Sequence, residues 1–151
     1  MYGAGLVVRE DKGDILVVAF RIFAGSVSIE IAEARAILEG LHPAADRNFF
    51  PFYIESDALN VINLSKSVSF LFGEVDNLIF DIRSLLGRFS GQVSFLFVPR
   101  LCNGVAHEIT KRAVHFDLFV IWDINIPLWL LVLAYVDVKL CWFSLMQFCF
   151  I

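Results

Sequence analysis

The stretch that decides the fold is FYIESDALN, residues 52–60, an apolar run that ends on a carboxylate and then turns polar. The pattern predicts a short strand, a corner and a helix. In an α/β sheet, sites are usually built at the carboxyl end of a strand, where side chains project into a crevice. We therefore expect Asp57 to lie at a functional edge. The alternative is that Ser56 or Asp57 only caps the helix and satisfies its free N–H groups.

Composition limits the class of protein to which this corner can belong. A chain of 151 residues favours one domain with enough material for a core. A net charge of −4 excludes a global positive field that would attract nucleic acid, so such binding must be local or metal-assisted. The chain is 58% hydrophobic with 16 Phe, which is too apolar for an ordinary soluble domain. Much of the excess lies after residue 115.

The cysteines and the first residues bear on the compartment. Cys102, Cys141 and Cys149 form no pair with metal-ligand spacing. The first residues lack the positive region and the long apolar region of a signal peptide. We therefore expect an intracellular protein, nuclear or cytoplasmic, with reduced cysteines.

The order of periodic segments predicts an α+β domain with a mixed sheet. Two apolar runs around a polar, glycine-containing turn predict a β-hairpin. A segment rich in Ala, Leu, Ile, Glu and Arg predicts a helix that ends at His42-Pro43. The expected elements are strands at residues 5–8, 15–20, 52–54 and 92–98, and helices at 29–41, 58–64, 75–89 and after Asn103.

Glu33 is out of place on the predicted helix over residues 29–41. It lies in the apolar face, one helical turn from Ile29 and one from Ile37. Burying an unpaired carboxylate is costly unless a partner or a metal compensates for the charge. Glu33 is therefore a candidate functional residue.

Four motifs follow one another along the chain: GAGLVVREDKG at residues 3–13, EIAEA at 30–34, ESDALN at 55–60, and VPR with NGVAH at 98–107. Together, and in this order, they resemble the ribonuclease-H-like domain of plant retroelement-derived proteins. The resemblance covers about residues 3–116. It implies an α/β domain with a five-stranded mixed sheet in the order 3-2-1-4-5, flanked by helices.

The resemblance also implies a site and a chemistry. In the family, an acidic cluster holds two divalent ions, normally Mg²⁺ or else Mn²⁺, which cut the RNA strand of an RNA–DNA hybrid. By motif, Glu33 and Asp57 take metal-binding and catalytic positions. His107 takes the fourth acidic position as a catalytic candidate, although imidazole suits Mg²⁺ poorly. The alternative for His107 is a solvated side chain on the helix surface.

One family feature is expected to be missing, because no strand with an Asp-Gly motif precedes Gly3. That first strand lies in the middle of the family's sheet. Its loss would separate the hairpin from the later strands and leave backbone N–H and C=O groups unpaired. We therefore expect a ribonuclease-H-like domain truncated at its N-terminus, without the first bridging aspartate and with impaired catalysis.

Two regions are predicted: the ribonuclease-H-like domain over residues 1–116 and a hydrophobic C-terminal tail over 117–151, unstructured or helical. The apolar run at 126–136 is too short to span a bilayer. Extending it to residue 151 would place Asp137 and Lys139 in the membrane, each costing roughly 2.5–3.5 kcal/mol. Self-association through strand edges and the tail is expected, and deleting residues 126–151 should then improve solubility.

The leading hypothesis is a ribonuclease-H-like nucleic-acid-binding domain, related to endoribonucleases that cut RNA–DNA hybrids, with impaired catalysis. Whether the chain is an active enzyme stays open. Two alternatives remain. One is a non-catalytic interaction module, which would keep the sheet and lose any dependence on metal. The other is a membrane-associated protein that uses its C-terminal tail.

Overall fold

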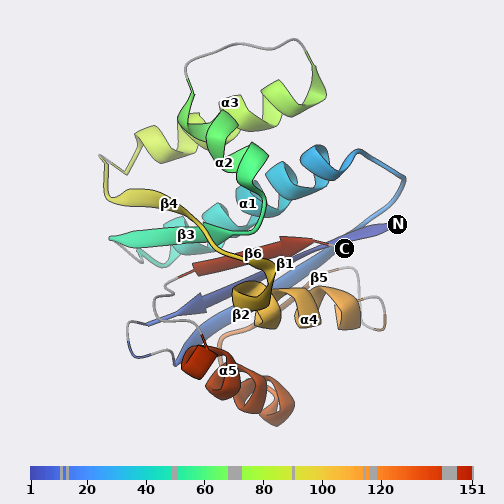
Figure 1. The fold of residues 1–151 in the computed structure, drawn as a ribbon, viewed down its shortest axis with the longest axis vertical. Helices are drawn as coiled ribbons and strands as arrows, with labels where there is room; N and C mark the ends of the chain where they lie inside the picture. The colour runs from blue at the N-terminus through green and yellow to red at the C-terminus, as the bar shows by residue number, and fades with distance from the viewer. Residues whose placement is uncertain are drawn as a thin grey trace.

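The computed structural model describes residues 1–10, 12, 14–48, 51–67, 73–89, 91–113, 115, 119–140 and 146–150. Its elements alternate between strands and helices, which confirms the predicted mixed α/β class (Figure 1). They are β1 (Tyr2–Arg9), β2 (Ile15–Phe23), α1 (Ile29–Asp46), β3 (Phe52–Ser56), α2 (Leu59–Lys66), α3 (Glu74–Gly87), β4 (Val93–Phe97), the 3-10 helix η1 (Arg100–Asn103), α4 (Gly104–Ala113), β5 (Phe119–Trp122), α5 (Leu128–Leu140) and β6 (Met146–Phe150).

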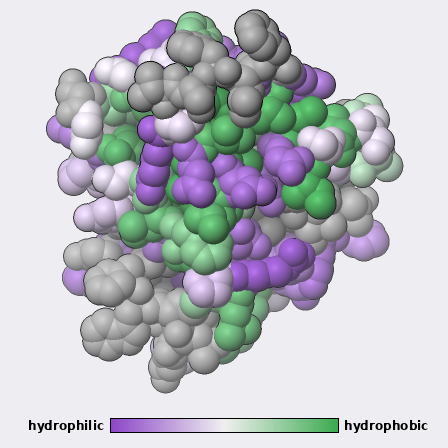
Figure 2. All heavy atoms as spheres, turned by 45° about the horizontal axis from the view of Figure 1, so that its top comes forward, coloured by the Kyte–Doolittle hydropathy of each residue, from purple (hydrophilic) through white to green (hydrophobic). Residues whose placement is uncertain are grey.

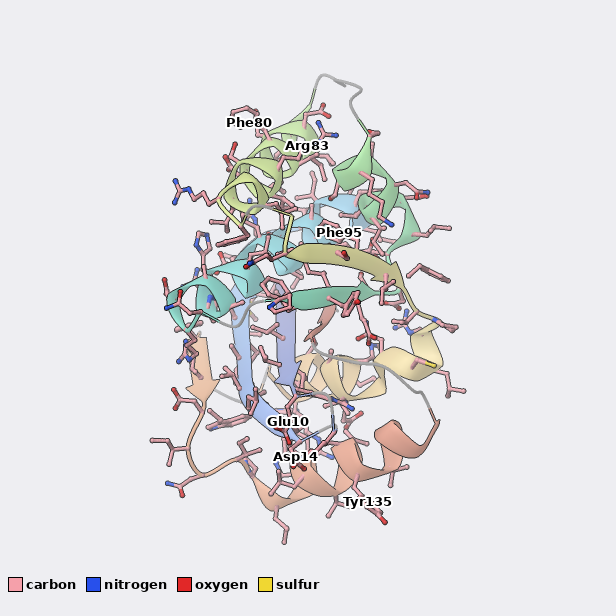
Figure 3. The ribbon with its side chains drawn as sticks, turned by 90° about the vertical axis from the view of Figure 1, so that its left-hand side faces the viewer. Glu10, Asp14, Phe80, Arg83, Phe95 and Tyr135 are labelled. Carbon is pink, nitrogen blue, oxygen red and sulfur yellow. The ribbon has the colours of Figure 1, made fainter. Side chains whose placement is uncertain are left out.

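All the strands belong to one mixed sheet with the order β4-β3-β6-β1-β2-β5. β1 and β2 form the predicted antiparallel hairpin, and β5 extends it at the edge. At the hairpin turn, the backbone N–H of Glu10 donates to the carbonyl of Asp14 at 3.0 Å (Figure 3). β3 and β4 run parallel to each other. The two halves of the sheet are joined by β6, which pairs with β3 and with β1.

Helices cover both faces of the sheet, with α1, α2 and α3 on one side and α4 and α5 on the other (Figure 1). Every residue of β1 is therefore buried. Leu6 and Val8 belong to the core under α1, whereas Val7 between them belongs to the core under α4. This alternation follows from the two-residue period of a strand.

The glycine at position 5 of the first motif is required by close packing of α4 on β1. A Cβ at this position would lie 2.3 Å from Oγ1 of Thr110 and 3.0 Å from the carbonyl oxygen of Ala106. Helix α4 therefore crosses β1 at a distance that only a residue without a side chain permits. The same Thr110 hydroxyl donates to the Ala106 carbonyl at 2.8 Å.

Helix α1 differs from its prediction, because it continues through Pro43 to Asp46 instead of ending at His42-Pro43. Proline removes one helical hydrogen bond, yet Pro43 and the neighbouring Ala44 are buried in the core. Burial of this turn offsets the missing bond. Ile29, predicted to face the core, is 64% exposed, so Glu33 lies at the margin of the buried face rather than in its middle.

The predicted gap in the middle of the sheet is absent, because β6 lies between β1 and β3. The sheet thus has six strands instead of the expected five. Of the region expected to be an unstructured or helical tail, residues 119–122 and 146–150 are strands of this sheet and Leu128–Leu140 is a helix. The physical reason is that two strands with open hydrogen-bonding edges between helical layers require a partner strand.

Helix α5 packs on α4 through Leu130 and Ala134, which are buried. The guanidinium of Arg112 lies 4.2 Å from the ring centroid of Trp129 and adds a cation–π contact. The opposite side of α5 is apolar and exposed, at Leu128, Leu131, Val132, Tyr135 and Val136. Within the described residues, no helix is both long enough and apolar enough to cross a membrane.

Helix α3 is tied to α2 by Arg83, which lies between them (Figure 3). Its guanidinium donates to the carbonyls of Leu64 and Ser65 at the end of α2, where backbone carbonyls have no helical partner. Hydrophilic and hydrophobic residues are intermixed on this side of the molecule (Figure 2). Phe80 is 63% exposed here and projects away from α3 (Figure 3).

Candidate functional site

The site is built at the carboxyl end of β3, where the chain turns at Asp57 into α2. The turn is fixed by Ser56, whose hydroxyl oxygen accepts a hydrogen bond from the backbone N–H of Ala58 at 3.1 Å. Ala58 is the N-cap of α2, and its side chain makes no capping hydrogen bond. Of the two residues in the capping alternative, Ser56 does bond a backbone N–H at this turn, whereas Asp57 is not the N-cap. Its carboxylate is left to face the rest of the site.

Asn103 orients that carboxylate. Its side-chain amide donates to Oδ1 of Asp57 at 2.8 Å, and Asn103 itself is fully buried at the end of η1. A hydrogen bond to a charged acceptor is stronger than a neutral one. The sequence assigned Asn103 only to the start of the last helix. Its contact with a residue 46 positions away follows from the fold alone.

Glu33 projects from α1 toward the same corner and is partly buried. Its pKa is raised from 4.5 to about 7, first because burial disfavours the charged form and next because Asp57 and Glu30 repel it, while Arg100 acts in the opposite direction. The repulsion by Asp57 means that the charges of the two carboxylates act on each other. The two acidic residues that the motifs selected are thus electrostatically coupled, and their role in binding a metal stays a prediction.

His107 on α4 contacts Arg100. Nη2 of Arg100 lies 3.2 Å from Nε2 and 3.3 Å from Nδ1 of the His107 ring. The pKa of His107 is lowered by burial and by the positive charges of Arg100 and Lys111, against the opposing effect of Asp57. The ring is therefore mainly neutral near pH 7. The His107 side chain is partly exposed and contacts Arg100, and its catalytic role stays a prediction.

The donor set fits one divalent ion better than two. Carboxylate oxygens are the ligands that Mg²⁺ prefers, and this ion keeps several waters, so Glu33 and Asp57 suffice for one weak site. In the part of the chain that the structure describes, no group of three or more His, Cys, Asp or Glu side chains converges. The positive charge of Arg100 also acts on Glu33 and partly offsets the negative charge that would attract a second ion.

Sequence reasoning assigned no role to Arg100 and underestimated Asn103, although both lie in the VPR and NGVAH motifs. Their proximity to acidic residues from earlier in the chain is the signal that only the fold supplies. A further difference concerns Cys102, which is disulfide-bonded, whereas reduced cysteines were expected. Spacing along the chain does not show which thiols come within bonding distance after folding.

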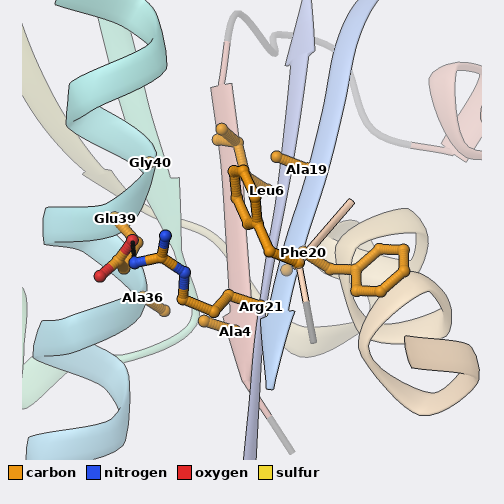
Figure 4. A pocket seen from close by; sticks show the side chains of 10 residues that line it. Ala4, Leu6, Ala19, Phe20, Arg21, Ala36, Glu39 and Gly40 are labelled. Atoms are coloured by element: carbon orange, nitrogen blue, oxygen red, sulfur yellow. Dashed lines mark hydrogen bonds and ion pairs between the residues drawn. The ribbon is translucent and has the colours of Figure 1, made fainter. Parts of the chain in front are cut away.

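Two cavities lie away from this corner. One, about 20 Å³, lies between α1 and the β1–β2 hairpin (Figure 4). It lies beside an ion pair in which Nη1 of Arg21 is 2.7 Å from Oε2 of Glu39. That volume is close to the space of a single water. The other, about 260 Å³, lies between α1 and α3 and is lined by His42, Asp81 and Arg88 among others. Neither includes Glu33, Asp57 or His107.

A mixed sheet covered on both faces by helices is consistent with a ribonuclease-H-like domain. The family model described as reverse transcriptase-like matches residues 2–113, which is most of the chain, and the protein belongs to that family. The resemblance drawn from the four motifs is thus confirmed. The comparisons with curated proteins and with solved structures gave no match.

Proposed function

We propose that this domain binds nucleic acid, with an RNA–DNA hybrid as its preferred partner, and that it hydrolyses the hybrid weakly at most. Membership of the reverse transcriptase-like family supports a nucleic-acid-related role. The observation that carries the proposal is the position of Asp57 at the end of β3, where Asn103 holds its carboxylate and its charge raises the pKa of Glu33.

The charges of this site suit a phosphate backbone held at one place. Arg100 is exposed at the rim, and Lys111 lies close enough to lower the pKa of His107. Arg100 could contact phosphate oxygens directly, whereas Lys111 would first have to leave its ion pair with Glu108. The net charge of −4 disfavours binding spread over the whole surface. Contacts with the 2′-hydroxyls would distinguish the RNA strand from DNA. We therefore expect binding that is local and weakens with salt.

One Mg²⁺ or Mn²⁺ would be held by Glu33 and Asp57, where a bound ion supplies an activated water and offsets charge on the leaving oxygen. Asn103 keeps the Asp57 carboxylate in place before any ion arrives. The raised pKa of Glu33 means that a proton competes with the ion, so ion binding should strengthen as the pH rises through about 7.

Hydrolysis should be weak because the family's reaction is expected to use two ions and more than two carboxylates. Among the described residues, no group of three or more potential metal ligands is found, and Glu33 and Asp57 are the two carboxylates that the motifs select. Losing a ligand that bridges two ions removes most of the rate, since charge on either oxygen is then left without compensation. His107 supplies a neutral nitrogen, which is a poor substitute for an oxygen toward Mg²⁺.

A binding-only module is the second candidate, and the small number of converging carboxylates favours it. Such a module would bind the hybrid equally well with and without a divalent ion. Association with a membrane through residues 126–151 has no such support. An intracellular location stays part of the proposal.

The test compares a labelled RNA–DNA hybrid with RNA and DNA duplexes of the same sequence, by fluorescence anisotropy and by gel assay with Mg²⁺ or Mn²⁺. We expect tighter binding of the hybrid, several-fold weaker binding after Arg100→Ala, and little cleavage. Glu33→Gln and Asp57→Asn should abolish any cleavage, whereas Glu30→Gln, a matched change on the same helix, should not.

Two outcomes would contradict the proposal. If none of the three nucleic acids binds at moderate salt, the domain has no role in nucleic-acid binding. If cleavage is fast and both carboxylate substitutions abolish it, the site is complete and the impaired catalysis is wrong.

A further inference from the structure

The middle of the sheet is a slot whose two walls do not pair with each other. One wall is β1 and the other is β3, and only β6 is hydrogen-bonded to both. β6 pairs antiparallel with β1 from Ala4↔Phe150 to Val8↔Met146. It pairs parallel with β3 at Glu55↔Gln147 and Ser56↔Phe148. The slot therefore recognises an extended segment through its backbone, along both of its edges.

Helices also cover the slot on both faces of the sheet. Helix α1 contacts β6 from one face of the sheet, and α4 contacts it from the other. Backbone N–H and C=O groups on the two walls are consequently shielded from water, and without a strand between them they would have no partner. Leaving these backbone groups unpaired would cost free energy, so binding of a strand between β1 and β3 is favoured.

The chain connects β6 to the rest of the domain through residues 141–145, which follow the end of α5 at Leu140. Cys102 is disulfide-bonded, and the other two cysteines of the chain both lie after residue 140, so this link must be reduced before β6 can leave. The pairing of β6 with β1 and β3 and its packing on α1 and α4 are non-covalent. The ladder that β6 forms would be the same if the strand came from another molecule. Residues 144–151 carry no charged side chain, as a segment for the centre of a covered sheet requires.

We propose that the slot between β1 and β3 is a strand-binding site that takes the C-terminal segment of this chain in trans as well as in cis. Two copies of the chain then exchange their β6 strands and form a dimer in which each sheet remains six-stranded. This is strand addition within a sheet, and backbone pairing supplies its affinity. The inference does not depend on the proposed function, since it uses neither Glu33 nor Asp57.

The first experiment uses the full chain with a specific protease site placed in residues 141–145. After folding, the chain is cut under reducing conditions, so that no disulfide at Cys102 holds the pieces together. A fluorescent peptide of residues 144–151, with a lysine tail for solubility, is then added in excess. We expect the cut chain to keep its C-terminal piece at first and to exchange it for the labelled peptide.

The control peptides test the backbone pairing. A Phe148→Pro peptide lacks an N–H in the middle of the ladder and should bind at least about tenfold more weakly. A Phe148→Leu peptide keeps the N–H and should bind nearly as well as the original. If cutting releases the C-terminal piece without a change in circular dichroism or melting temperature, the slot needs no strand and the inference is wrong. Equal binding of the proline and leucine peptides would refute it as well.

The second experiment asks whether whole chains exchange. Two populations labelled with a donor and an acceptor dye are mixed at high concentration, and energy transfer and mass by light scattering are recorded. Deleting residues 142–144 shortens the segment between α5 and β6, which disfavours pairing within one molecule and should convert the protein to a dimer. Lengthening this segment with glycine and serine should favour the monomer. A shortened chain that stays a folded monomer would overturn the proposal.

Discussion

Replacing Glu33 by Gln should remove a pH dependence of stability that the candidate site imposes on the domain. The pKa of Glu33 is raised from 4.5 to about 7 in the folded protein, mainly by burial and then by the repulsion of Asp57. Between these values the folded state holds a proton that the unfolded state has released. The free energy of unfolding therefore falls as the pH rises from about 4.5 to about 7.

The size of the effect follows from the same values. The difference between 4.5 and about 7 corresponds to roughly 3 kcal/mol at about 1.36 kcal/mol per pH unit. Glu33 is only partly buried, so solvent screening reduces this to about 1–2 kcal/mol. At pH 8 the Glu33→Gln variant should accordingly be more stable than the wild type by that amount. Near pH 4.5 the two proteins should differ little.

The measurement is urea unfolding of both proteins at several pH values from 4.5 to 8. His107 titrates in the opposite sense, because its lowered pKa makes the folded state gain stability as the pH rises, and comparing the two proteins at each pH cancels this effect. Asp57→Asn should give a smaller change in the same direction, since it removes one source of repulsion. Parallel stability curves for wild type and Glu33→Gln would refute the reasoning.

Three further predictions concern a divalent ion, the helix crossing and the exposed side of α5. At pH 8, millimolar Mg²⁺ should raise the melting temperature of the wild type but not of Glu33→Gln, because only the wild type keeps both carboxylates; equal shifts would show binding elsewhere. Gly5→Ala should lower the free energy of unfolding by about 1–3 kcal/mol in urea, with partial rescue by Thr110→Ala, since its Cβ would meet that hydroxyl at 2.3 Å. Val132→Lys should reduce concentration-dependent association in light scattering without lowering the melting temperature, because Val132 is 57% exposed on an apolar helix side; unchanged association would exclude this surface.

The sequence alone determined the class of fold and selected Glu33 and Asp57 as the acidic residues of the candidate site. A hairpin, a helix and a strand ending at Asp57 were readable because the period of apolar residues is local and depends on neighbours along the chain. The four motifs placed Glu33, Asp57 and His107 in one family pattern. Local patterns failed where burial decides, as at Pro43, which lies inside α1 because the turn around it packs into the core.

Only the tertiary structure decided what fills the middle of the sheet. The sequence indicated a missing strand and an apolar tail, and it suggested that deleting residues 126–151 would improve solubility. The structure joins these observations, because β6 comes from that tail and lies between β1 and β3. The deletion should therefore destabilise the sheet instead. Pairing between strands distant in sequence depends on open backbone edges meeting in space, and hydrophobic periodicity does not encode that meeting.

The geometry of the site was likewise a product of the fold. Asn103 and Arg100 acquired their roles because η1 follows β4, which lies beside β3 and runs parallel to it, so that their side chains arrive at the same sheet edge as Asp57. The raised pKa of Glu33 has the same origin, since burial and a neighbouring carboxylate are properties of packed elements. The sequence selects the residue types, and the three-dimensional arrangement sets their charges and contacts.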